Sequence, residues 1–454
     1  MFESVNPATG ERVETYEEHD GDQISHRLAR AWTGWGSWRT TSFSTRADLL
    51  RNVADGLEKR KAELAELMTT EMGKPIGSAE GEVDKCAWVC RHYADHGEGY
   101  LQHDVIETDA VRSYVRFDPL GPVLAVMPWN FPLWQVFRFA APSLMAGNVG
   151  LLKHASNVPG CALAIEDVFV QAGAPEGVFT TLLVGSGAAG DLIADDRVRA
   201  VTLTGSVGAG RAVAGQAGQH LKKTVLELGG SDAFVVLEDA DLDQAARIGV
   251  QSRLINNGES CIAAKRFIVV DAVADEFAQR FRSELEAKTV GDPMDRSTDV
   301  GPLARGDLRD ELHDQVRRTV DAGAQLVTGG RALDRPGYYY APTLLDHVDA
   351  EWAAGAEETF GPVAAVLRVP DEESAVAIAN ASDFGLGASV WTADLERGER
   401  VAARIEAGCV FVNQLVKSDP RVPFGGVKLS GYGRELGSYG IKEFVNAKTV
   451  WVEG

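Results

Sequence analysis

Short apolar runs alternate with helical stretches along most of this chain, and that alternation restricts its possible folds more than any other feature. One series of such runs lies between about residues 120 and 240, at 123–127, 149–152, 178–183, 200–203 and 233–237. Another series follows at 266–270, 363–367 and 409–412. Because strands separated by helices build βαβ units around a parallel sheet, the pattern predicts two α/β domains. The first strand of the second domain is expected just past Cys261.

Two further segments have patterns of their own. Residues 44–72 place apolar side chains at helical spacing, and Gly73-Lys74-Pro75 is expected to end that helix. Residues 100–117 have the pattern of a β-hairpin with its turn at 108–110, and residues 443–452 are another strand candidate. A hairpin with exposed apolar residues is an unprotected sheet edge, which favours association with another chain.

The chain is acidic, with 66 Asp and Glu against 45 Lys and Arg and a net charge of −21. An acidic surface repels nucleic acid and anionic lipid, so neither is an expected partner. No apolar run is long enough to cross a membrane, and the N-terminus has no signal-sequence pattern, so a cytoplasmic protein is expected. The acidity, combined with few lysines, suggests a host with high internal salt, where ions screen the self-repulsion.

The five cysteines are scattered, which argues against a disulfide framework and for a reducing compartment. Cys86 and Cys90 are followed closely by His92 and His96, a spacing that resembles a metal site. On a helix, however, the two cysteines would share one face and the histidines would point to the other. We therefore expect no metal there.

Cys261 and Glu227 are the first candidates for catalysis. Cys261 follows the turn 256–260, and Glu227 precedes Leu228-Gly229-Gly230. A thiol nucleophile needs a base or a lowered pKa, although a lone cysteine in such a run is usually an inert buried thiol. What favours catalysis is Pro128-Trp129-Asn130-Phe131-Pro132, where two prolines stiffen the chain around one amide. Asn130 is therefore a candidate donor for an oxyanion.

Two glycine-rich turns are candidates for binding a dinucleotide. The turn 185–190 matches the GxGxxG pattern formally, but it lies far from the first strand and is a weak indication. The turn 204–210 follows a strand-like run and opens a helix, whose N-terminal N–H groups can bind a pyrophosphate. A plain strand-to-helix turn is the alternative at that place.

An ordered set of motifs resembles the NAD(P)-dependent aldehyde dehydrogenases over essentially the whole chain. The motifs are Asn6–Gly10, Pro128–Pro132, Leu203–Ser206, Glu227–Gly230, Asn257–Cys261, Glu357–Pro362 and Pro423–Gly431. The resemblance implies an α/β fold with a Rossmann-like cofactor-binding domain (1–99 and 120–226) and a second α/β catalytic domain (227–426). It also implies a β oligomerisation element (100–119 and 443–454), which pairs between subunits of a homodimer or homotetramer, and a return segment to the cofactor domain (427–442).

The resemblance further implies a mechanism. The Cys261 thiolate attacks an aldehyde, the Asn130 side chain and the Cys261 N–H hold the oxyanion, and hydride passes to NAD(P)+. Glu227 then activates the water that hydrolyses the thioester. Glu259 occupies a position where the family usually has Gln, and its charge is expected to point away from Cys261. The cofactor-binding positions carry over to Trp129, Lys153, Ser156, Gly185, Gly205, Ser206, Glu358 and Phe360.

The segment Lys153-His154-Ala155-Ser156 bears on the choice of cofactor. NAD-preferring members of the family resemble Lys-Pro-Ser-Glu here, and their acidic residue repels a 2′-phosphate. This chain has no carboxylate at that place, and a cation with a hydroxyl can bind a phosphate. We therefore expect NADP to be accepted, alongside NAD or in preference to it.

Three segments, 129–139, 152–157 and 261–267, look most like the short succinate-semialdehyde dehydrogenase branch. On one helix, Asn130, Trp134 and Arg138 would face the same way, so that Arg138 could pair with a substrate carboxylate. The alternative is a structural arginine that is ion-paired between helices. Ser260 and Ser418 add hydroxyls where the family's tunnel is lined. Succinate semialdehyde is the first substrate candidate, and glutarate semialdehyde or another aliphatic aldehyde is the alternative.

Two other classes of protein stay open. A cysteine hydrolase or transferase would also use Cys261, but it usually needs a histidine base, and none of the nine histidines falls in a matched motif. A non-catalytic homologue is the second possibility. The joint presence of Asn130, Glu227 and Cys261 argues against it.

Overall fold

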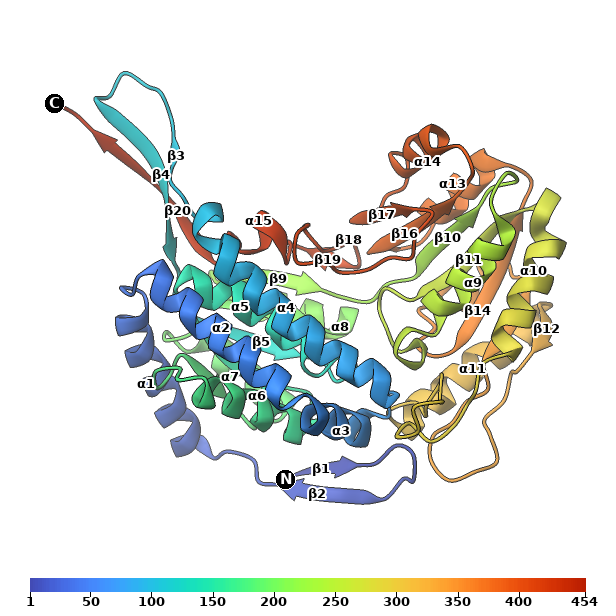
Figure 1. Cartoon of the computed structure of the whole chain (residues 1–454), viewed down its shortest axis with the longest axis horizontal. Coiled ribbons are helices and arrows are strands. Elements are labelled where there is room, and N and C mark those ends of the chain that lie inside the picture. Colours follow the sequence, from blue (N-terminus) through green and yellow to red (C-terminus); the bar gives the residue numbers. More distant parts are fainter.

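Two mostly parallel sheets, each packed between helices, form the two sides of the molecule (Figure 1). The computed structural model describes all residues, 1–454. The first sheet has the order β19-β9-β8-β5-β6-β7. Its strands are β5 (Pro122–Met127), β6 (Val149–His154), β7 (Phe179–Thr181), β8 (Ala200–Thr204), β9 (Lys223–Glu227) and β19 (Gly431–Tyr432). All neighbours in it are parallel except β19, which runs antiparallel to β9.

The strand order reverses at the centre of this sheet. From β5 the chain proceeds through β6 and β7 on one side, and through β8 and β9 on the other. In open α/β sheets, ligands bind outside the carboxyl ends of the strands at such a reversal point. The crevice between the ends of β5 and β8 is therefore the expected binding place.

Helices from the N-terminal part of the chain and between the strands surround the first sheet. They are α1 (Gly21–Trp38), α2 (Phe43–Lys59), α3 (Lys61–Met72), α4 (Ile76–Tyr100), α5 (Trp134–Ala146), α6 (Pro159–Gln171), α7 (Ala189–Ala194) and α8 (Val207–Gln219). The helix predicted over 44–72 is in fact two helices, because the backbone of Arg60 leaves the helical region between α2 and α3. Gly73, with a φ of 83°, ends α3 as predicted.

The second sheet has the order β12-β13-β14-β11-β10-β16-β17. Its strands are β10 (Asp232–Val236), β11 (Ala264–Val270), β12 (Gln325–Thr328), β13 (Thr343–Asp346), β14 (Val363–Val369), β16 (Gly387–Trp391) and β17 (Cys409–Val412). The helices around it are α9 (Leu242–Arg253), α10 (Asp271–Glu286), α11 (Gly306–Ala322), α12 (Ala353–Ala356), α13 (Glu372–Asn380) and α14 (Leu395–Ala402). The α/β class predicted from the alternating pattern is confirmed.

One strand assignment from the sequence is wrong. The apolar run 233–237 continued the first series, but β10 pairs with β11 and β16 in the second sheet. The second sheet thus begins before Cys261, not after it. The last parallel strand of the first sheet is β9, which the pattern missed because only Val225 and Leu226 among its residues are apolar. Gly229 and Gly230 lie in the short crossing from β9 to β10.

Alternate residues of the second sheet pack into two separate cores. Val235, Ile268 and Val390 belong to one apolar cluster, and Phe234, Phe267 and Val366 belong to another. Because successive side chains of a strand point to opposite faces, these clusters lie on the two faces of the sheet. A single larger cluster fills both faces of the first sheet and the N-terminal helices.

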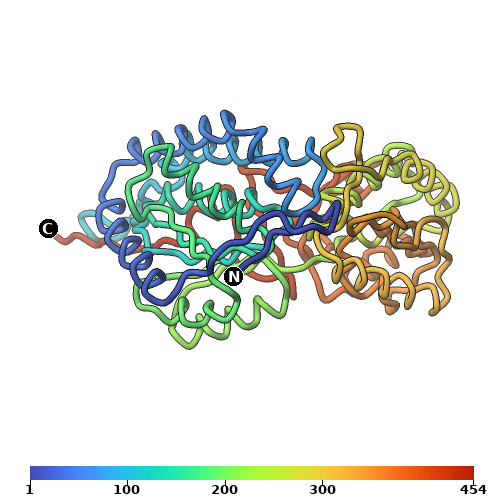
Figure 2. The backbone as a smooth tube through the Cα atoms, turned by 90° about the horizontal axis from the view of Figure 1, so that it is seen from below, coloured from blue at the N-terminus to red at the C-terminus, as the bar shows by residue number.

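The N-terminal hairpin ties the two sides together. β1 (Phe2–Val5) pairs with β2 (Arg12–Tyr16), and the Tyr338 N–H donates to the carbonyl of Pro7 in the turn between them, at 2.9 Å. Figure 2 shows this segment running along the molecule from the first side to the second. The two sides are therefore connected at a place far from the strand crossing.

A small sheet projects from the first side (Figure 1). It consists of β3 (Asp104–Val105), β4 (Arg112–Pro119) and β20 (Val445–Val452), with β4 in the middle. This confirms the hairpin and the C-terminal strand as elements. The remaining short elements are β15 (Phe384–Gly385), which pairs with β18 (Val427–Lys428), and α15 (Gly437–Gly440).

None of the helices combines the length and the apolar character needed to span a bilayer. Cys86 and Cys90 lie on α4 and are fully buried, while His96 is exposed. The side chains of the chain form no group of three or more potential metal ligands.

Candidate active site

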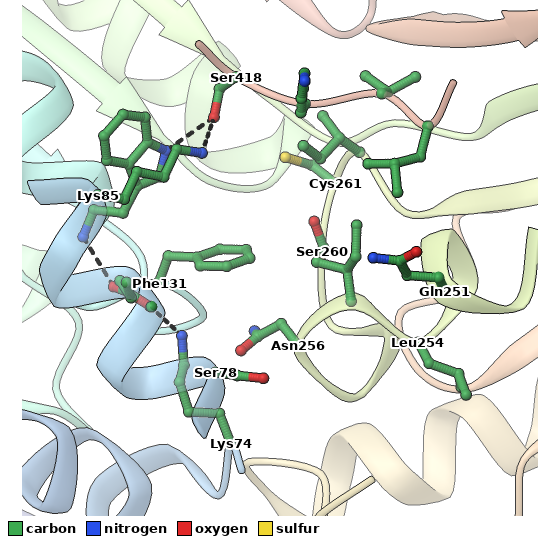
Figure 3. Close-up of a pocket in the computed structure, with 18 of the residues that line it drawn as sticks. Lys74, Ser78, Lys85, Phe131, Gln251, Leu254, Asn256, Ser260, Cys261 and Ser418 are labelled. Atoms are coloured by element: carbon green, nitrogen blue, oxygen red, sulfur yellow. Dashed lines mark hydrogen bonds and ion pairs between the residues drawn. The ribbon is translucent and has the colours of Figure 1, made fainter. Parts of the chain in front are cut away.

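Two cavities meet at Cys261. One has a volume of about 430 Å³ and is bordered by α4, α5 and the loop 415–418. The other, about 180 Å³, lies at the carboxyl ends of β5 and β8. Cys261 is in the wall of both cavities, and Figure 3 shows its sulfur pointing into the larger one. A group bound at this sulfur is therefore accessible from two sides.

The turn before Cys261 is tight and left-handed. Asn256, Asn257 and Gly258 all have positive φ, at 53°, 59° and 83°, and asparagine tolerates this region better than most residues. A Cβ on Gly258 would lie 2.3 Å from the carbonyl carbon of Gly361, so only glycine fits there. The Asn257 amide donates to the carbonyls of Gly73 and Pro302, at 3.1 and 2.9 Å, which holds the turn in place.

Asn130 lies beside this turn, directly bound to it. Its side-chain amide donates to the Glu259 carbonyl at 3.1 Å, and the Asn256 amide donates to the Asn130 carbonyl at 2.7 Å. A side-chain amide has two N–H groups, so one remains for a substrate oxygen. The side chain is 4% exposed and lines the smaller cavity together with Cys261.

The sequence placed Asn130 on one helix with Trp134 and Arg138, and this is wrong. α5 begins only at Trp134, and Asn130 lies in the irregular turn before it. The buried Glu82 explains the start of the helix, because its carboxylate accepts the N–H groups of Leu133 and Trp134, both at 2.9 Å. A carboxylate at the first turn favours helix initiation there.

Glu227 ends β9 and is 2% exposed. Neither carboxylate oxygen has a hydrogen-bond partner. Burial raises the pKa of Glu227 well above its usual range, although the Arg138 charge opposes this. Gly425 provides its space, since a Cβ there would lie 2.6 Å from a carboxylate oxygen. Because both oxygens lack a partner in the protein, a water molecule can bind there, and the ionised carboxylate can take a proton from it.

Burial also raises the pKa of the Cys261 thiol, to about 12. The positive charges of Arg138 and Lys265 oppose this shift, and the negative charges of Glu358 and Asp232 add to it. The nucleophile is therefore a thiol in this state, and the reactive thiolate requires a base or an added positive charge nearby. Glu259 points away from it as expected, because its carboxylate accepts the Ala304 N–H at 3.0 Å.

Lys265 is a site residue that the sequence did not indicate. Its ammonium group is fully buried and donates to the carbonyls of Ser260, Cys261 and Ala263, at 3.0, 2.9 and 3.2 Å. It lies 3.8 Å from the Glu358 carboxylate. Lys265 thus fixes the backbone on the C-terminal side of the nucleophile. Nothing in the local sequence singles out this lysine at the start of β11.

The smaller cavity lies at the reversal point of the first sheet. Its walls include Trp129 and Asn130 after β5, Gly205 and Ser206 after β8, and Glu358 and Phe360 from the second side. The Trp129 and Phe360 rings meet edge to face, with centroids 5.8 Å apart. Ser206 caps α8, its hydroxyl accepting the Ala209 N–H at 3.3 Å. The N-terminus of α8 therefore opens into a cleft that can take an anionic dinucleotide.

Lys153, Ser156 and Gly185 do not line this cavity. They lie where β6 and β7 end, along the same carboxyl edge of the sheet. Lys153 is 8% exposed and has no ion-pair partner, and burial lowers its pKa. An unpaired buried cation next to an exposed serine fits a phosphate at this edge. Gly185 leads into a single turn, 186–188, so its glycine-rich pattern does not open a long helix.

The larger cavity contains all four residues predicted to line a substrate site. They are Trp134, Arg138, Ser260 and Ser418. The Ser260 hydroxyl is fully buried and has no partner. Ser418 accepts the Trp134 indole N–H at 3.1 Å.

Arg138 has protein partners already. It is ion-paired with the buried Glu435, donates to the Thr204 hydroxyl at 3.3 Å, and its guanidinium carbon lies 4.9 Å from the Phe424 ring centroid. These partners give Arg138 the structural, ion-paired role that the sequence left open as the alternative. Its side chain also lines the wall of the larger cavity. Glu435 lies outside every motif singled out from the sequence, and only the packing of β19 and its neighbours brings it to Arg138.

Comparisons with known proteins agree with this geometry. The aldehyde dehydrogenase family model matches residues 1–450. A probable succinate-semialdehyde dehydrogenase (NADP+) of Synechocystis sp. is 56% identical over 449 residues, which cover 99% of each chain. Succinate-semialdehyde dehydrogenase (NADP+) 1 of Mycobacterium bovis is 50% identical over 452 residues, again with 99% of each chain covered.

Solved structures give the same result. The succinic semialdehyde dehydrogenase of Streptococcus pyogenes, crystallised in complex with NADP+, superposes with a TM-score of 0.98. It is 39% identical, and 100% of each chain is covered. The resemblance found from the ordered motifs is thus confirmed, and the chain belongs to the aldehyde dehydrogenase family, whose enzymes oxidise aldehydes.

Proposed function

We propose that this enzyme oxidises succinate semialdehyde to succinate, with NADP+ as the preferred hydride acceptor and NAD+ as an accepted one. The observation that carries the proposal is the position of Cys261 between the two cavities. An aldehyde carbon bound to this sulfur has the cofactor cleft on one side and the substrate cavity on the other. The relatives described above carry names with the same substrate and cofactor, which supports the choice.

The catalytic roles follow from the contacts of three residues. Cys261 attacks the aldehyde carbon, and the free N–H of the Asn130 amide, together with the Cys261 backbone N–H, stabilises the oxyanion. When bound, the nicotinamide supplies the hydride acceptor. Glu227, which has no hydrogen-bond partner in the protein, then, in its ionised form, takes a proton from the water that hydrolyses the thioester. Asn256 and Lys265 hold the backbone on the two sides of Cys261.

The proposed cofactor residues divide between two functions. Ser206 and Gly205, at the start of α8, bind the pyrophosphate, and Trp129, Glu358 and Phe360 border the nicotinamide end of the cleft. Lys153 and Ser156 bind the ribose at the far end, where the unpaired lysine charge favours a 2′-phosphate. Gly185 stays a proposed contact at the end of β7.

The proposed substrate carries a carboxylate because the larger cavity is lined by cations. Arg138 and Lys85 both border it, and Trp134, Ser260 and Ser418 add polar contacts. Glutarate semialdehyde, with one more methylene, is the second candidate. A methylene changes binding by only about 1–3 kcal/mol in such pockets, so a volume of about 430 Å³ does not exclude it.

Initial rates on a small panel test this proposal. The substrates are succinate semialdehyde, glutarate semialdehyde, butanal and benzaldehyde, each with NADP+ and with NAD+, followed by absorbance at 340 nm. We expect the highest kcat/KM with succinate semialdehyde and NADP+. A higher kcat/KM with butanal would contradict the proposed substrate, and a large preference for NAD+ would contradict the proposed cofactor.

The panel also separates the enzyme from the other classes of protein. A cysteine hydrolase would turn over its substrate without any change at 340 nm. No histidine lines either cavity, so the base that such an enzyme usually needs is missing beside Cys261. A protein without any reaction on the panel would be a non-catalytic homologue.

The projecting sheet supports a homodimer or homotetramer. β20 is an edge strand, and Val105, Ile106, Val111 and Trp451 on this sheet are exposed. An unpaired edge with apolar side chains favours pairing with a second copy. Light scattering on the purified protein should give two or four times the mass of 48.7 kDa. A monomer at micromolar concentration would contradict this expectation. The five cysteines are free and scattered, which fits a reducing compartment such as the cytoplasm.

A further inference from the structure

Lys85 lies in the wall of the substrate cavity together with Ser418 and Trp134. Its ammonium group donates to the Ser418 hydroxyl at 2.8 Å and lies 4.1 Å from the Trp134 ring centroid. The Trp134 indole N–H donates to the same hydroxyl at 3.1 Å. Figure 3 shows Lys85 and Ser418 on the side of the cavity that the Cys261 sulfur faces. This cluster brings α4, α5 and the loop after β17 together.

Lys85 is a cation without an anionic partner. It forms no ion pair, because the two carboxylates whose charges act on it, Glu82 and Asp419, are paired with other cations. Glu82, one helical turn before it, is ion-paired with Lys74 and caps α5. Asp419, next to Ser418, pairs with Arg421 at 2.6 Å. A partly buried ammonium group without a counter-charge is costly unless an anion binds to it.

The hydrogen bonds of Ser418 determine where its own proton can be donated. A hydroxyl has one proton to donate and two lone pairs to accept with. Lys85 and Trp134 both donate to the Ser418 oxygen, so its two lone pairs are used. The Ser418 proton must therefore be donated to a third group, and the open side of this hydroxyl is the cavity. The cluster thus presents an O–H and an ammonium group to the same space.

We propose that Lys85 binds the carboxylate of the substrate, with the Ser418 hydroxyl as the second donor and Trp134 as the residue that positions both. The assignment rests on the proposed function and identifies which cation recognises the acid end of the semialdehyde. The carboxylate accepts one hydrogen bond from the ammonium group and one from the hydroxyl. Its carbon chain extends from there to Cys261.

Arg138 has a different part in the same cavity. The charge of Arg138 is balanced by Glu435. Arg138 also lies close enough to Glu227 for its positive charge to oppose the rise in the pKa of Glu227. Removal of Arg138 would leave Glu435 buried without a counter-charge and raise the pKa of Glu227 further. An Arg138→Ala variant would then lose activity on charged and uncharged aldehydes alike. Removal of Lys85, in contrast, should affect only the aldehyde that carries a carboxylate.

A pH profile provides an independent test. Burial lowers the pKa of Lys85 to about 8, with the Arg138 charge acting in the same direction and Cys86, Glu82 and Asp419 acting against it. Lys85 is charged below that value and loses its charge above it. The KM for succinate semialdehyde should therefore rise as the pH increases through about 8, while the KM for butanal should not follow it.

Two substitutions of Lys85 and one control test the assignment in the full-length enzyme. Lys85→Met keeps the length of the side chain and removes the charge, and Lys85→Arg keeps the charge. Lys59→Met removes an exposed lysine charge on α2, outside both cavities, and serves as the control. Each variant is assayed with succinate semialdehyde and with butanal, which has the same chain length and no carboxylate.

We expect Lys85→Met to raise the KM for succinate semialdehyde by about 10- to 100-fold, the range for a lost hydrogen bond between charged groups. Its kinetics with butanal should stay within about twofold of the wild type, Lys85→Arg should recover most of the loss, and Lys59→Met should match the wild type. Equal changes on both substrates in Lys85→Met, with no recovery in Lys85→Arg, would overturn the assignment.

Succinate binding, measured by calorimetry, provides a readout that needs no turnover. Lys85→Met should lose affinity for succinate by a similar factor even if it is inactive, and unchanged affinity would overturn the assignment. The wild-type enzyme separates this inference from the function on which it rests. If the wild type does not prefer succinate semialdehyde to butanal, the proposed function fails. If it does and Lys85→Met keeps the preference, only the role of Lys85 fails.

Discussion

Cys261→Ala is expected to reduce aldehyde oxidation by about 10,000-fold or more, because the thiol nucleophile has no substitute in either cavity. Of the five cysteines, only Cys261 lines either of these two cavities, and Cys86, Cys90 and Cys161 are buried. The variant should fold normally, since the removed sulfur leaves the turn and its hydrogen bonds intact. The measurement is kcat with succinate semialdehyde and NADP+, accompanied by a thermal melt.

Cys90→Ala is the control, because Cys90 is buried on α4 and lines neither cavity. Its activity should stay within about twofold of the wild type, as is usual for a substitution that touches no reacting group. Wild-type activity in Cys261→Ala, or an equal loss in both variants, would mean that Cys261 is not the nucleophile.

Glu227→Gln is expected to separate the two halves of the reaction. The amide cannot accept a proton from water, so thioester hydrolysis should slow by about 100- to 10,000-fold. Formation of the thioester does not need that proton transfer, so a rapid burst of NADPH equal to the number of active sites should remain. Stopped-flow absorbance at 340 nm measures both phases.

Glu227 also predicts a pH dependence in the wild type. Burial holds its pKa well above the usual range, so the group is protonated at low pH and becomes a base only as the pH rises. The steady-state rate should therefore increase with pH, and the increase should disappear in Glu227→Gln. A variant that keeps both the wild-type rate and the wild-type pH profile would exclude Glu227 as the base.

The sequence predicts the sheets well where strands are buried on both faces. β5, β6 and β8 are buried, largely apolar runs between turns. The pattern did not predict β9, because its residues Lys223, Thr224 and Glu227 are polar and leave only a short apolar run. β10 was placed in the wrong sheet, because an apolar run carries no information about which of two sheets it joins. The chain passes from the first sheet to the second at Gly229 and Gly230, and the path it takes there depends on tertiary contacts.

The candidate site divides in the same way. Cys261, Asn130 and Glu227 lie in motifs with unusual local sequence, and the structure places Asn130 and Cys261 in one wall. Lys85, Lys265 and Glu435 lie in ordinary helical, strand and loop sequence, so nothing local marks them. Their roles depend on partners that are distant in the sequence or lie on other elements. The partner of Lys85, for example, is Ser418, 333 residues away. The same lack of tertiary information placed Asn130 on α5, because the capping carboxylate of Glu82 comes from another helix.

Mass spectrometry of Glu227→Gln tests the central claim most directly. The variant is incubated with succinate semialdehyde and NADP+, quenched in acid and digested. The account predicts one succinyl group per chain, attached to Cys261, and no adduct when NADP+ is omitted and the reaction cannot proceed past the reversible hemiacetal. NADPH formation without an adduct on Cys261, or with an adduct on another residue, would contradict it.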